Sequence, residues 1–274
     1  MTIPITLLYV PADQPNTVDK ALASAADVVI IDLEDAVTPE RKELARDGLL
    51  RMVEGAGDRQ MQVRVNAANT PWSEADLAIV ATLPTAVGAR LPKMVDPDQV
   101  RRIADSAGGR RLHLLVESAL GVERAFALAT AHPLVASISL GEADLRSDLG
   151  LTSGRGLLWA RSRIVNAARA AGLPAPTMSV YANVSDLVGL ASSCAEGREL
   201  GFLGRTAIHP RQLETIAASF RPTDAEVTAA RAVLAAVASA TESGRGALAL
   251  EDGAFLDVAM VEGARKTLAL AERS

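Results

Sequence analysis

Short apolar runs that end in charged residues recur along the chain. The clearest is VVIIDLEDAV at residues 28–37, which reads as a fully buried strand that stops at Asp32, Glu34 and Asp35. Other runs behave in the same way: LHLLVES ends in Glu117, VASISLGEAD ends in Glu142 and Asp144, MQVRVNAAN carries Arg64, and VGARLPKM carries Lys93. Acidic residues at these positions have little use in packing. The pattern therefore predicts a polar site built where several buried strands end.

Eight such β-like runs alternate with stretches of helical spacing. The runs are residues 5–10, 27–33, 61–65, 86–92, 111–117, 135–140, 177–181 and 200–208. Alternation of this kind favours parallel strands joined by helical crossovers, and eight units indicate an α/β fold of the (β/α)8 TIM barrel type. An open doubly wound sheet is the alternative. It normally has a Gly-rich phosphate turn after its first strand, and VPADQPN is not such a turn.

The end of the chain exceeds what a minimal barrel needs. We expect residues 1–221 to form the barrel and residues 222–274 to form a helical extension, with an Ala-rich helix, a Gly-containing turn and a last helix. Two interpretations of the extension are equally favoured. It either caps the barrel or packs on a neighbouring subunit.

Composition narrows the class of protein. The 274 residues carry a formal net charge of −5 and only 3% aromatic residues, which argues against a nucleic-acid surface. No apolar run is long enough to cross a bilayer, and the first residues lack the basic start of a signal peptide. Cys194 is the only cysteine, so no internal disulfide can form. We therefore expect a cytoplasmic protein with a small-molecule partner, and neither a nucleic acid nor a membrane as partner.

Two carboxylates are the strongest candidates for chemistry. Glu117 and Asp144 follow adjacent predicted strands, so barrel closure brings them together, where they repel each other unless a cation or a shared proton intervenes. Oxygen ligands of this kind suit Mg²⁺, which keeps several waters and takes one or two carboxylates. A proton-sharing acid pair and carboxylates bonded to loop amides remain the alternatives.

Two cations accompany these acids. Arg64, inside an apolar strand, requires a carboxylate partner, either from a substrate or from a neighbour such as Asp32 or Glu34. Lys93 invites a Schiff-base interpretation, but nearby acids keep it charged, so a structural ion pair is favoured. Zinc is disfavoured because no histidine pair has ligand spacing. The motifs of the common hydrolases, kinases and dehydrogenases are missing from the sequence.

A longer set of motifs resembles one family. The ordered segments YVPADQPN…KA, ADVVIIDLEDAV, VRVN, LPK, LVESALG, SLGEADLRSDLG, RSRIVNAARAAG, ELGFLGRTAIHPRQ, FRPT and DGAFLD resemble the citrate lyase β-subunit-like (CitE-like) proteins of the HpcH/HpaI aldolase superfamily. The resemblance covers nearly the whole chain. It implies a modified TIM barrel, trimeric or hexameric, that makes or breaks a carbon–carbon bond between a 2-keto acid and the acetyl group of a coenzyme A or acyl-carrier thioester.

The resemblance also implies roles for residues. Glu117 and Asp144 match the Mg²⁺ ligands, and Arg64 matches the arginine that binds the keto-acid carboxylate. Asp257 matches an acid or base supplied across a subunit interface, although Asp252 competes with it because the segment around Gly253 departs from the motif.

Further matches concern substrate binding. Lys20 matches a basic residue near the nucleotide part of the thioester. Arg205 stands where lysine is common, in a position for a phosphate contact. Hydrogen bonds from the loop that begins with Gly141 and Glu142 are expected to serve the keto-acid oxygens.

These expectations define a function and its rivals. We expect a Mg²⁺-dependent lyase that cleaves or forms a 3-hydroxyacyl-CoA, such as malyl-CoA or citramalyl-CoA, and releases acetyl-CoA and a 2-keto acid. A synthase or a thioester hydrolase is equally compatible, because enolate formation is common to all three. The rivals are a CoA-independent 2-keto acid aldolase, a β-subunit that acts only inside a multi-chain citrate lyase, and a non-catalytic binding protein.

Overall fold

The computed structural model describes residues 4–242, 248–249, 255–256 and 258–272. The chain divides into two compact units, Ile3–Phe220 and Arg221–Ser274 together with Met1–Thr2. The division falls one residue before the boundary that the sequence suggests. Each unit is described by itself.

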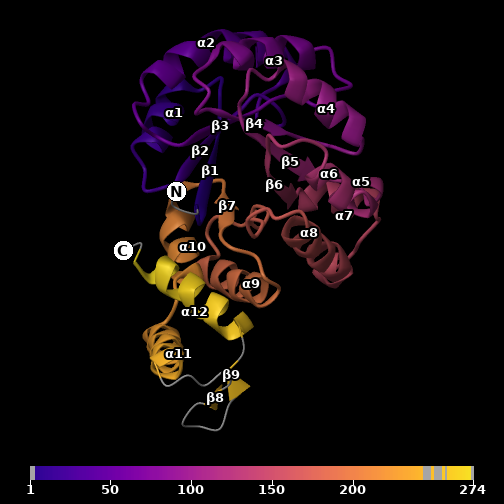
Figure 1. The fold of residues 1–274 in the computed structure, drawn as a ribbon. Coiled ribbons are helices and arrows are strands. Elements are labelled where there is room, and N and C mark those ends of the chain that lie inside the picture. The colour runs from indigo at the N-terminus through magenta and orange to yellow at the C-terminus, as the bar shows by residue number, and fades with distance from the viewer. Residues whose placement is uncertain (1–3, 243–247, 250–254, 257, 273–274) are drawn as a thin grey trace. The chain divides into compact units, whose positions relative to one another are not determined.

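A curled parallel sheet forms the centre of the larger unit (Figure 1). Its strand order is β6-β5-β4-β3-β2-β1-β7, and every pairing within it is parallel, as the alternation of apolar and helical stretches predicts. The strands are β1 (Thr6–Pro11), β2 (Val28–Asp32), β3 (Met61–Arg64), β4 (Gly88–Leu91), β5 (Leu112–Val116), β6 (Val135–Leu140) and β7 (Arg205–Ala207).

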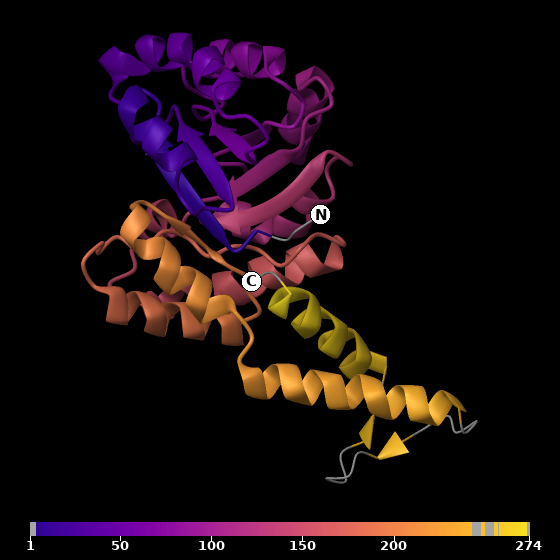
Figure 2. The same ribbon diagram turned by 90° about the vertical axis from the view of Figure 1, so that its left-hand side faces the viewer.

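Helices follow the strands and lie along the outer face of the curl, as Figure 2 also shows. They are α1 (Pro15–Leu22), α2 (Lys42–Glu54), α3 (Ser73–Thr82), α4 (Pro97–Ser106), α5 (Ala119–Glu123), α6 (Ala125–Ala129), α7 (Glu142–Asp148), α8 (Leu158–Ala170), α9 (Leu187–Glu199) and α10 (Leu213–Phe220). Short 3-10 turns, η1 (Pro39–Arg41), η2 (Gly154–Leu157) and η3 (Pro210–Gln212), precede α2, α8 and α10.

Local sequence signals set several helix ends. The Asp96 side chain accepts a hydrogen bond from the backbone N–H of Asp98, and Pro97 occupies the first helical position of α4. Gly172 follows α8 with a φ of +73°, a conformation that glycine adopts without steric cost.

The sequence-based expectation of eight strands is met only in part. Within the described residues the sheet has seven strands, and the segment predicted at residues 177–181 forms a single bridge between Met178 and Arg205. The Met178 N–H donates to the Gly204 carbonyl, and the Met178 carbonyl accepts from Thr206 N–H, at 2.9 and 3.1 Å. Towards β6, the contact recorded is a 3.5 Å approach of the Thr177 and Ser139 hydroxyls. The Pro176 carbonyl also accepts from the Leu203 N–H at 2.9 Å, so the backbone pairing of this segment is directed to β7, and a side-chain contact takes the place of a ladder with β6.

The inner face of the sheet changes character around the curl. On β1 and β2, Leu7, Val28 and Ile30 form an apolar cluster against Tyr9. On the central strands the inward row is polar. Arg64 pairs in register with Arg90, and Arg90 pairs with His113. The polar inward side chains of the sheet therefore begin at Asp32, the last residue of β2, and continue over β3 to β5.

The smaller unit is helical. Helices α11 (Asp224–Glu242) and α12 (Val258–Ala271) pack through Ala230, Val233 and Ala264, and β8 (Leu248–Ala249) pairs antiparallel with β9 (Phe255–Leu256). Asp252 and Asp257 lie outside the described residues. In the part of the chain that the structure covers, no helix combines the length and the apolar character that crossing a membrane requires.

His113 gives the stability a pH dependence. Burial, with the positive charges of Arg90 and Arg111, lowers the pKa of His113 to about 3, while its Nδ1 lies 2.8 Å from the Ser137 hydroxyl. Because the folded-state pKa is below the unfolded value of about 6.5, the neutral ring stabilises the fold above that pH, and this contribution is lost as the pH falls towards 3. Lowering the pH from 7.5 to 5.5 should cost about 1 kcal/mol through this residue. Urea denaturation of the wild type and His113→Asn at both pH values measures the effect. Equal pH slopes in the two proteins would contradict the assignment.

Candidate active site

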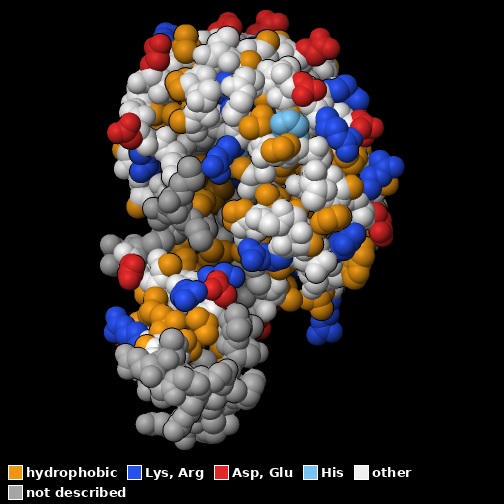
Figure 3. All heavy atoms as spheres, viewed as in Figure 1, with side chains coloured by type: hydrophobic (Ala, Val, Ile, Leu, Met, Phe, Trp, Pro, Cys, Tyr) orange, Lys and Arg blue, Asp and Glu red, His pale blue; other side chains and the backbone are white. Residues whose placement is uncertain are grey.

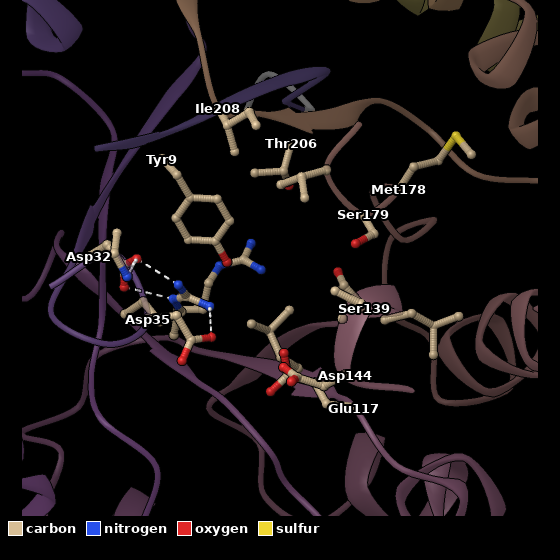
Figure 4. Close-up of a pocket in the computed structure, with 18 residues that line it drawn as sticks. Tyr9, Asp32, Asp35, Glu117, Ser139, Asp144, Met178, Ser179, Thr206 and Ile208 are labelled. Carbon is tan, nitrogen blue, oxygen red and sulfur yellow. Dashed lines mark hydrogen bonds and ion pairs between the residues drawn. The ribbon is translucent and has the colours of Figure 1, made fainter. Parts of the chain in front are cut away.

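A cavity of about 300 Å³ opens at the carboxyl ends of the strands. Side chains from β1 to β5 and from the loop after β6 line it, among them Tyr9, Asp32, Arg64, Arg90, Glu117 and Asp144. Figure 4 shows Asp32 and Asp35 on one side of this space and Glu117 and Asp144 on another. Carboxyl ends of parallel strands meet at one edge, so residues far apart in sequence converge here.

Asp32 and Arg64 form a bidentate ion pair across β2 and β3. Arg64 Nε and Nη2 donate to the two carboxylate oxygens of Asp32 at 2.7 and 2.6 Å, and the Asp32 side chain is 1% exposed. The guanidinium also lies over the Tyr9 ring, 4.7 Å from its centroid. Burial lowers the pKa of Arg64, but the hydrogen bonds to Asp32 together with the negative charges of Asp32 and Glu34 raise it above its ordinary value. The partner that the sequence suggests for Arg64 is thus confirmed, and Nη1 is the nitrogen that Asp32 leaves unused.

Glu34 lies between two cations. Its Oε1 accepts from Lys93 Nζ at 2.7 Å, and its Oε2 lies 3.0 Å from Arg64 Nη1 without hydrogen-bond geometry. Burial raises the pKa of Glu34 to about 7 even though both cations oppose the shift. The contact with Glu34 confirms the ion-pair interpretation of Lys93.

The backbone of Lys93 holds a second acid. Lys93 has a φ of +54°, which a residue with a side chain seldom adopts, and its N–H donates to Glu117 Oε2 at 2.7 Å. Strain of this kind persists where the surroundings over-determine it. The strained loop orients the Glu117 carboxylate towards the cavity.

Glu117 and Asp144 both line the cavity, as the sequence predicts. Burial raises the pKa of Glu117, and the charge of Asp144 raises it further, whereas Lys93 lowers it. Gly141 provides the space for this carboxylate, since a Cβ atom there would lie 2.1 Å from Glu117 Oε1. A hard divalent cation fits the pair, because it relieves the repulsion and takes oxygen ligands. Among the described residues, no cluster of three or more acids, histidines or cysteines could hold a metal, so water or substrate must complete such a site.

The turn into α7 offers backbone donors. The Gly141 N–H is taken by the Val116 carbonyl, and the Glu142 N–H donates to the Ser179 hydroxyl at 3.2 Å. Ala143 and Asp144 follow in the first helical turn, where N–H groups have no intrahelical acceptor, and both residues line the cavity. The backbone N–H groups of residues 143 and 144 are therefore the donors that this loop can offer to a ligand. Gly141 contributes instead by leaving space for the Glu117 carboxylate.

Three residues with predicted substrate contacts lie elsewhere. The Glu142 carboxylate is bound by Arg161 through two hydrogen bonds of 2.8 Å. Arg205 is 2% exposed and donates to the Ser179 carbonyl and the Ser193 hydroxyl. Lys20 is exposed in the last turn of α1. None of the three lines the cavity. Strand and helix spacing place these residues near the rim, but the direction of each side chain depends on partners distant in sequence.

The sequence analysis did not select several of the residues that line the cavity. Arg90 is a cation within an apolar strand, the signal that identifies Arg64, yet only Lys93 in the same segment drew attention. Tyr9 belongs to an apolar strand and gave no signal. Ser139 of β6 and Ser179 of the segment that bridges to β7 both lie on the side of the cavity away from Asp32 in Figure 4.

The face of the molecule in Figure 3 shows acidic and basic side chains interspersed with hydrophobic ones. Nucleic-acid surfaces typically gather basic side chains into one stripe. The charges that organise this protein lie instead in the interior cavity.

A parallel α/β fold with convergent acids and an orienting arginine defines the class as a lyase-type site at the carboxyl edge of a curled sheet. Residues 6–210 match the HpcH/HpaI aldolase/citrate lyase family, and the chain belongs to this family. The resemblance inferred from the sequence motifs is thereby confirmed.

Individual relatives match over almost the whole chain. A (3S)-malyl-CoA thioesterase of Cereibacter sphaeroides is 36% identical, over 97% of this chain and 94% of the relative. An L-malyl-CoA/beta-methylmalyl-CoA lyase of the same species is 30% identical, over 97% and 93%. The crystal structure of CitE from Mycobacterium tuberculosis with magnesium, acetoacetate and coenzyme A has a TM-score of 0.81 and 32% identity, and covers 98% of both chains.

The Asp32–Arg64 pair should be important for stability. Asp32→Asn should lower the free energy of unfolding by about 3 kcal/mol, because it breaks the bidentate ion pair of a buried guanidinium. Asp35→Asn is the matched control: Asp35 is 58% exposed and 3.6 Å from Arg64, so its change should be below about 0.5 kcal/mol. Chemical denaturation of both variants measures the difference. Similar losses in the two would show that the bidentate geometry has no special weight.

Proposed function

We propose that the protein is a Mg²⁺-dependent carbon–carbon lyase that cleaves or forms a 3-hydroxyacyl-CoA, with acetyl-CoA and a 2-keto acid as the other partners. The observation that carries the proposal is the pair Glu117 and Asp144 in one cavity, with Gly141 making room for the first carboxylate. The malyl-CoA lyase and the magnesium- and CoA-bound CitE among the relatives support the same chemistry.

Each residue of the cavity has a role in this proposal. Glu117 and Asp144 would hold Mg²⁺, which when bound supplies positive charge where negative charge develops on the substrate oxygen. Arg64 Nη1, oriented by Asp32, binds the keto-acid carboxylate. The N–H groups of Ala143 and Asp144 donate to the keto-acid oxygens.

The reaction is a retro-aldol cleavage. The bond between the hydroxyl carbon and the thioester α-carbon breaks, and its electron pair passes to the thioester as an enolate. The hydroxyl oxygen gives its proton to solvent and its carbon becomes the keto carbon, and Asp257 protonates the enolate to give the acetyl thioester. In the reverse direction Asp257 removes that proton. Asp252 is the alternative acid.

Larger-scale features complete the proposal. Segment 177–181 would take the place of the eighth strand in a (β/α)8 barrel formed by residues 1–221. Its bridge to β7 supports one of the two strand pairings that barrel closure needs. Residues 222–274 would contribute to subunit contacts in a homotrimer or hexamer, and would present Asp257 to a neighbouring site. Exposed Lys20 would contact the nucleotide part of the thioester, whereas buried Arg205 would support the wall rather than bind phosphate.

Thioester hydrolysis is the second candidate function. The malyl-CoA thioesterase relative, at 36% identity, favours it. The same Mg²⁺ site would serve, and product analysis distinguishes the two reactions, because hydrolysis releases free CoA and leaves the carbon skeleton intact.

The metal pair provides the direct test. With malyl-CoA or citramalyl-CoA as substrate, wild-type protein with Mg²⁺ should release acetyl-CoA and keto acid, and EDTA should abolish turnover. Glu117→Ala or Asp144→Ala should lower kcat/KM by at least about 100-fold and weaken Mg²⁺ binding in calorimetry, because each removes one of two carboxylate ligands. Asp257→Ala should stop turnover but keep Mg²⁺ affinity. Unchanged turnover in Glu117→Ala would remove the proposal, and equal turnover with the free hydroxy acid would favour the CoA-independent aldolase.

Gly141→Ala tests the geometry of the same site without changing any charge. The added Cβ would collide with Glu117 Oε1 and displace the carboxylate, so Mg²⁺ affinity should fall about 10-fold or more while the protein stays folded. Gly150→Ala, also in the larger unit and with nothing within 4 Å of the new Cβ, is the steric control, and any strain from its φ of +63° should affect stability alone. Wild-type Mg²⁺ affinity in Gly141→Ala would show that Glu117 does not bind the metal.

A further inference from the structure

The cavity contains a buried cation that the proposed mechanism does not use. Arg90, in the middle strand β4, is 2% exposed and lines the cavity. Its recorded hydrogen bond runs from Nε to the Gln62 side-chain oxygen at 2.9 Å, which occupies one edge of the guanidinium. Among the described residues, no carboxylate lies within 4 Å of it.

The neighbouring cations are paired. Arg64 has Asp32 at 2.6 Å, and Lys93 has Glu34 at 2.7 Å. Buried guanidinium groups are normally paired because an isolated charge away from water is costly. Arg90 therefore differs from both neighbouring cations in having no internal counter-ion among the residues described.

Arg64 lies beside Arg90 in register, but its charge is paired with Asp32. The other groups near Arg90 are uncharged. Gln62 is neutral, and the Tyr9 ring lies 6.0 Å from the guanidinium carbon. Burial raises the pKa of Tyr9, so its phenol keeps its proton, and burial lowers the pKa of His113, so its imidazole stays neutral. This part of the cavity thus presents positive charge to whatever enters.

Register places Arg90 at the inner end of the cavity. Arg90 is level with Arg64 on β3 and with His113 on β5, and His113 precedes Glu117 by four residues. The Nε of Arg90 donates to Gln62, two residues before Arg64, so the side chain turns away from the strand ends. The metal pair lies beyond the strand ends, so a ligand held there would extend inward towards Arg90.

Taking the proposed function as its basis, we infer that Arg90 binds a second carboxylate of the substrate, and that the preferred 2-keto acid is a dicarboxylic acid. The 2-keto carboxylate lies at the Glu117 and Asp144 end, and the distal carboxylate accepts hydrogen bonds from the Nη groups of Arg90. A planar guanidinium suits a carboxylate bidentately, and a cavity of about 300 Å³ accommodates a four- or five-carbon acid.

Calorimetric binding in the presence of Mg²⁺ tests this inference with acids matched in chain length. Oxaloacetate is compared with 2-oxobutyrate, and 2-oxoglutarate with 2-oxopentanoate. Wild-type protein should bind at least one dicarboxylic acid roughly 10- to 100-fold more tightly than its monocarboxylic partner, the range for one charge-assisted contact. Arg90→Met should remove this preference and leave monocarboxylate affinity unchanged. Arg90→Lys should keep part of it.

Arg101→Met is the matched control, because it removes one positive charge at an exposed site on α4 and should leave the preference intact. Unfolding temperatures of all variants separate misfolding from lost recognition. Equal wild-type affinity for both acids of each pair would overturn the inference. So would an Arg90→Met variant that loses both acids equally, since Arg90 would then bind the carboxylate next to the metal. In either of these results the wild type still binds a keto acid, so the proposed lyase function is not contradicted. A wild type that binds no keto acid in the presence of Mg²⁺ would contradict both the inference about Arg90 and the proposed function.

Discussion

The bidentate ion pair between Asp32 and Arg64 is the interaction on which the site depends. It joins the carboxyl ends of two adjacent strands, and it fixes a guanidinium that would otherwise have several rotamers in a buried space. Asp32 also accepts hydrogen bonds from the N–H groups of Glu34 and Ala36. One carboxylate thus orders both the arginine and the loop that carries the next acids.

Charge balance explains how so many ionisable groups share one interior. Lys93 neutralises Glu34 through its side chain and orients Glu117 through its backbone. Burial raises the pKa of Glu117, and the neighbouring charge of Asp144 raises it further. A dication is the natural complement at that end of the cavity, and an anion is the complement at the Arg90 end. The two unmet charges have opposite signs and line the same cavity, which is the electrostatic pattern expected of a site for an anionic, metal-binding ligand.

Membership of the HpcH/HpaI aldolase/citrate lyase family places this electrostatic pattern in a known class of enzymes. The features common to the proposed mechanism, Arg64 and the two acids, would handle the part of the substrate shared by all 2-keto acids. Arg90 belongs to a strand rather than to a loop, so its guanidinium is supported by the sheet and would act as a rigid selector of the acyl group. Selection by a buried cation is strong, because a ligand without a carboxylate leaves that cation unpaired.

The sequence by itself determined the alternation of strands and helices, the parallel sheet and the family. It also placed Glu117, Asp144 and Arg64 at or near strand ends, offered Asp32 or Glu34 as a partner of Arg64, and favoured an ion pair for Lys93, since apolar runs that stop at charged residues reveal both strands and strand ends. Only the tertiary structure decided that segment 177–181 forms one bridge instead of a strand, that Glu142 and Arg205 turn to internal partners, and that Arg90 faces the cavity. The physical reason is the distance in sequence over which each property is set. Periodicity and strand ends depend on neighbouring residues, whereas the direction of a long charged side chain depends on the groups distant in sequence with which it pairs.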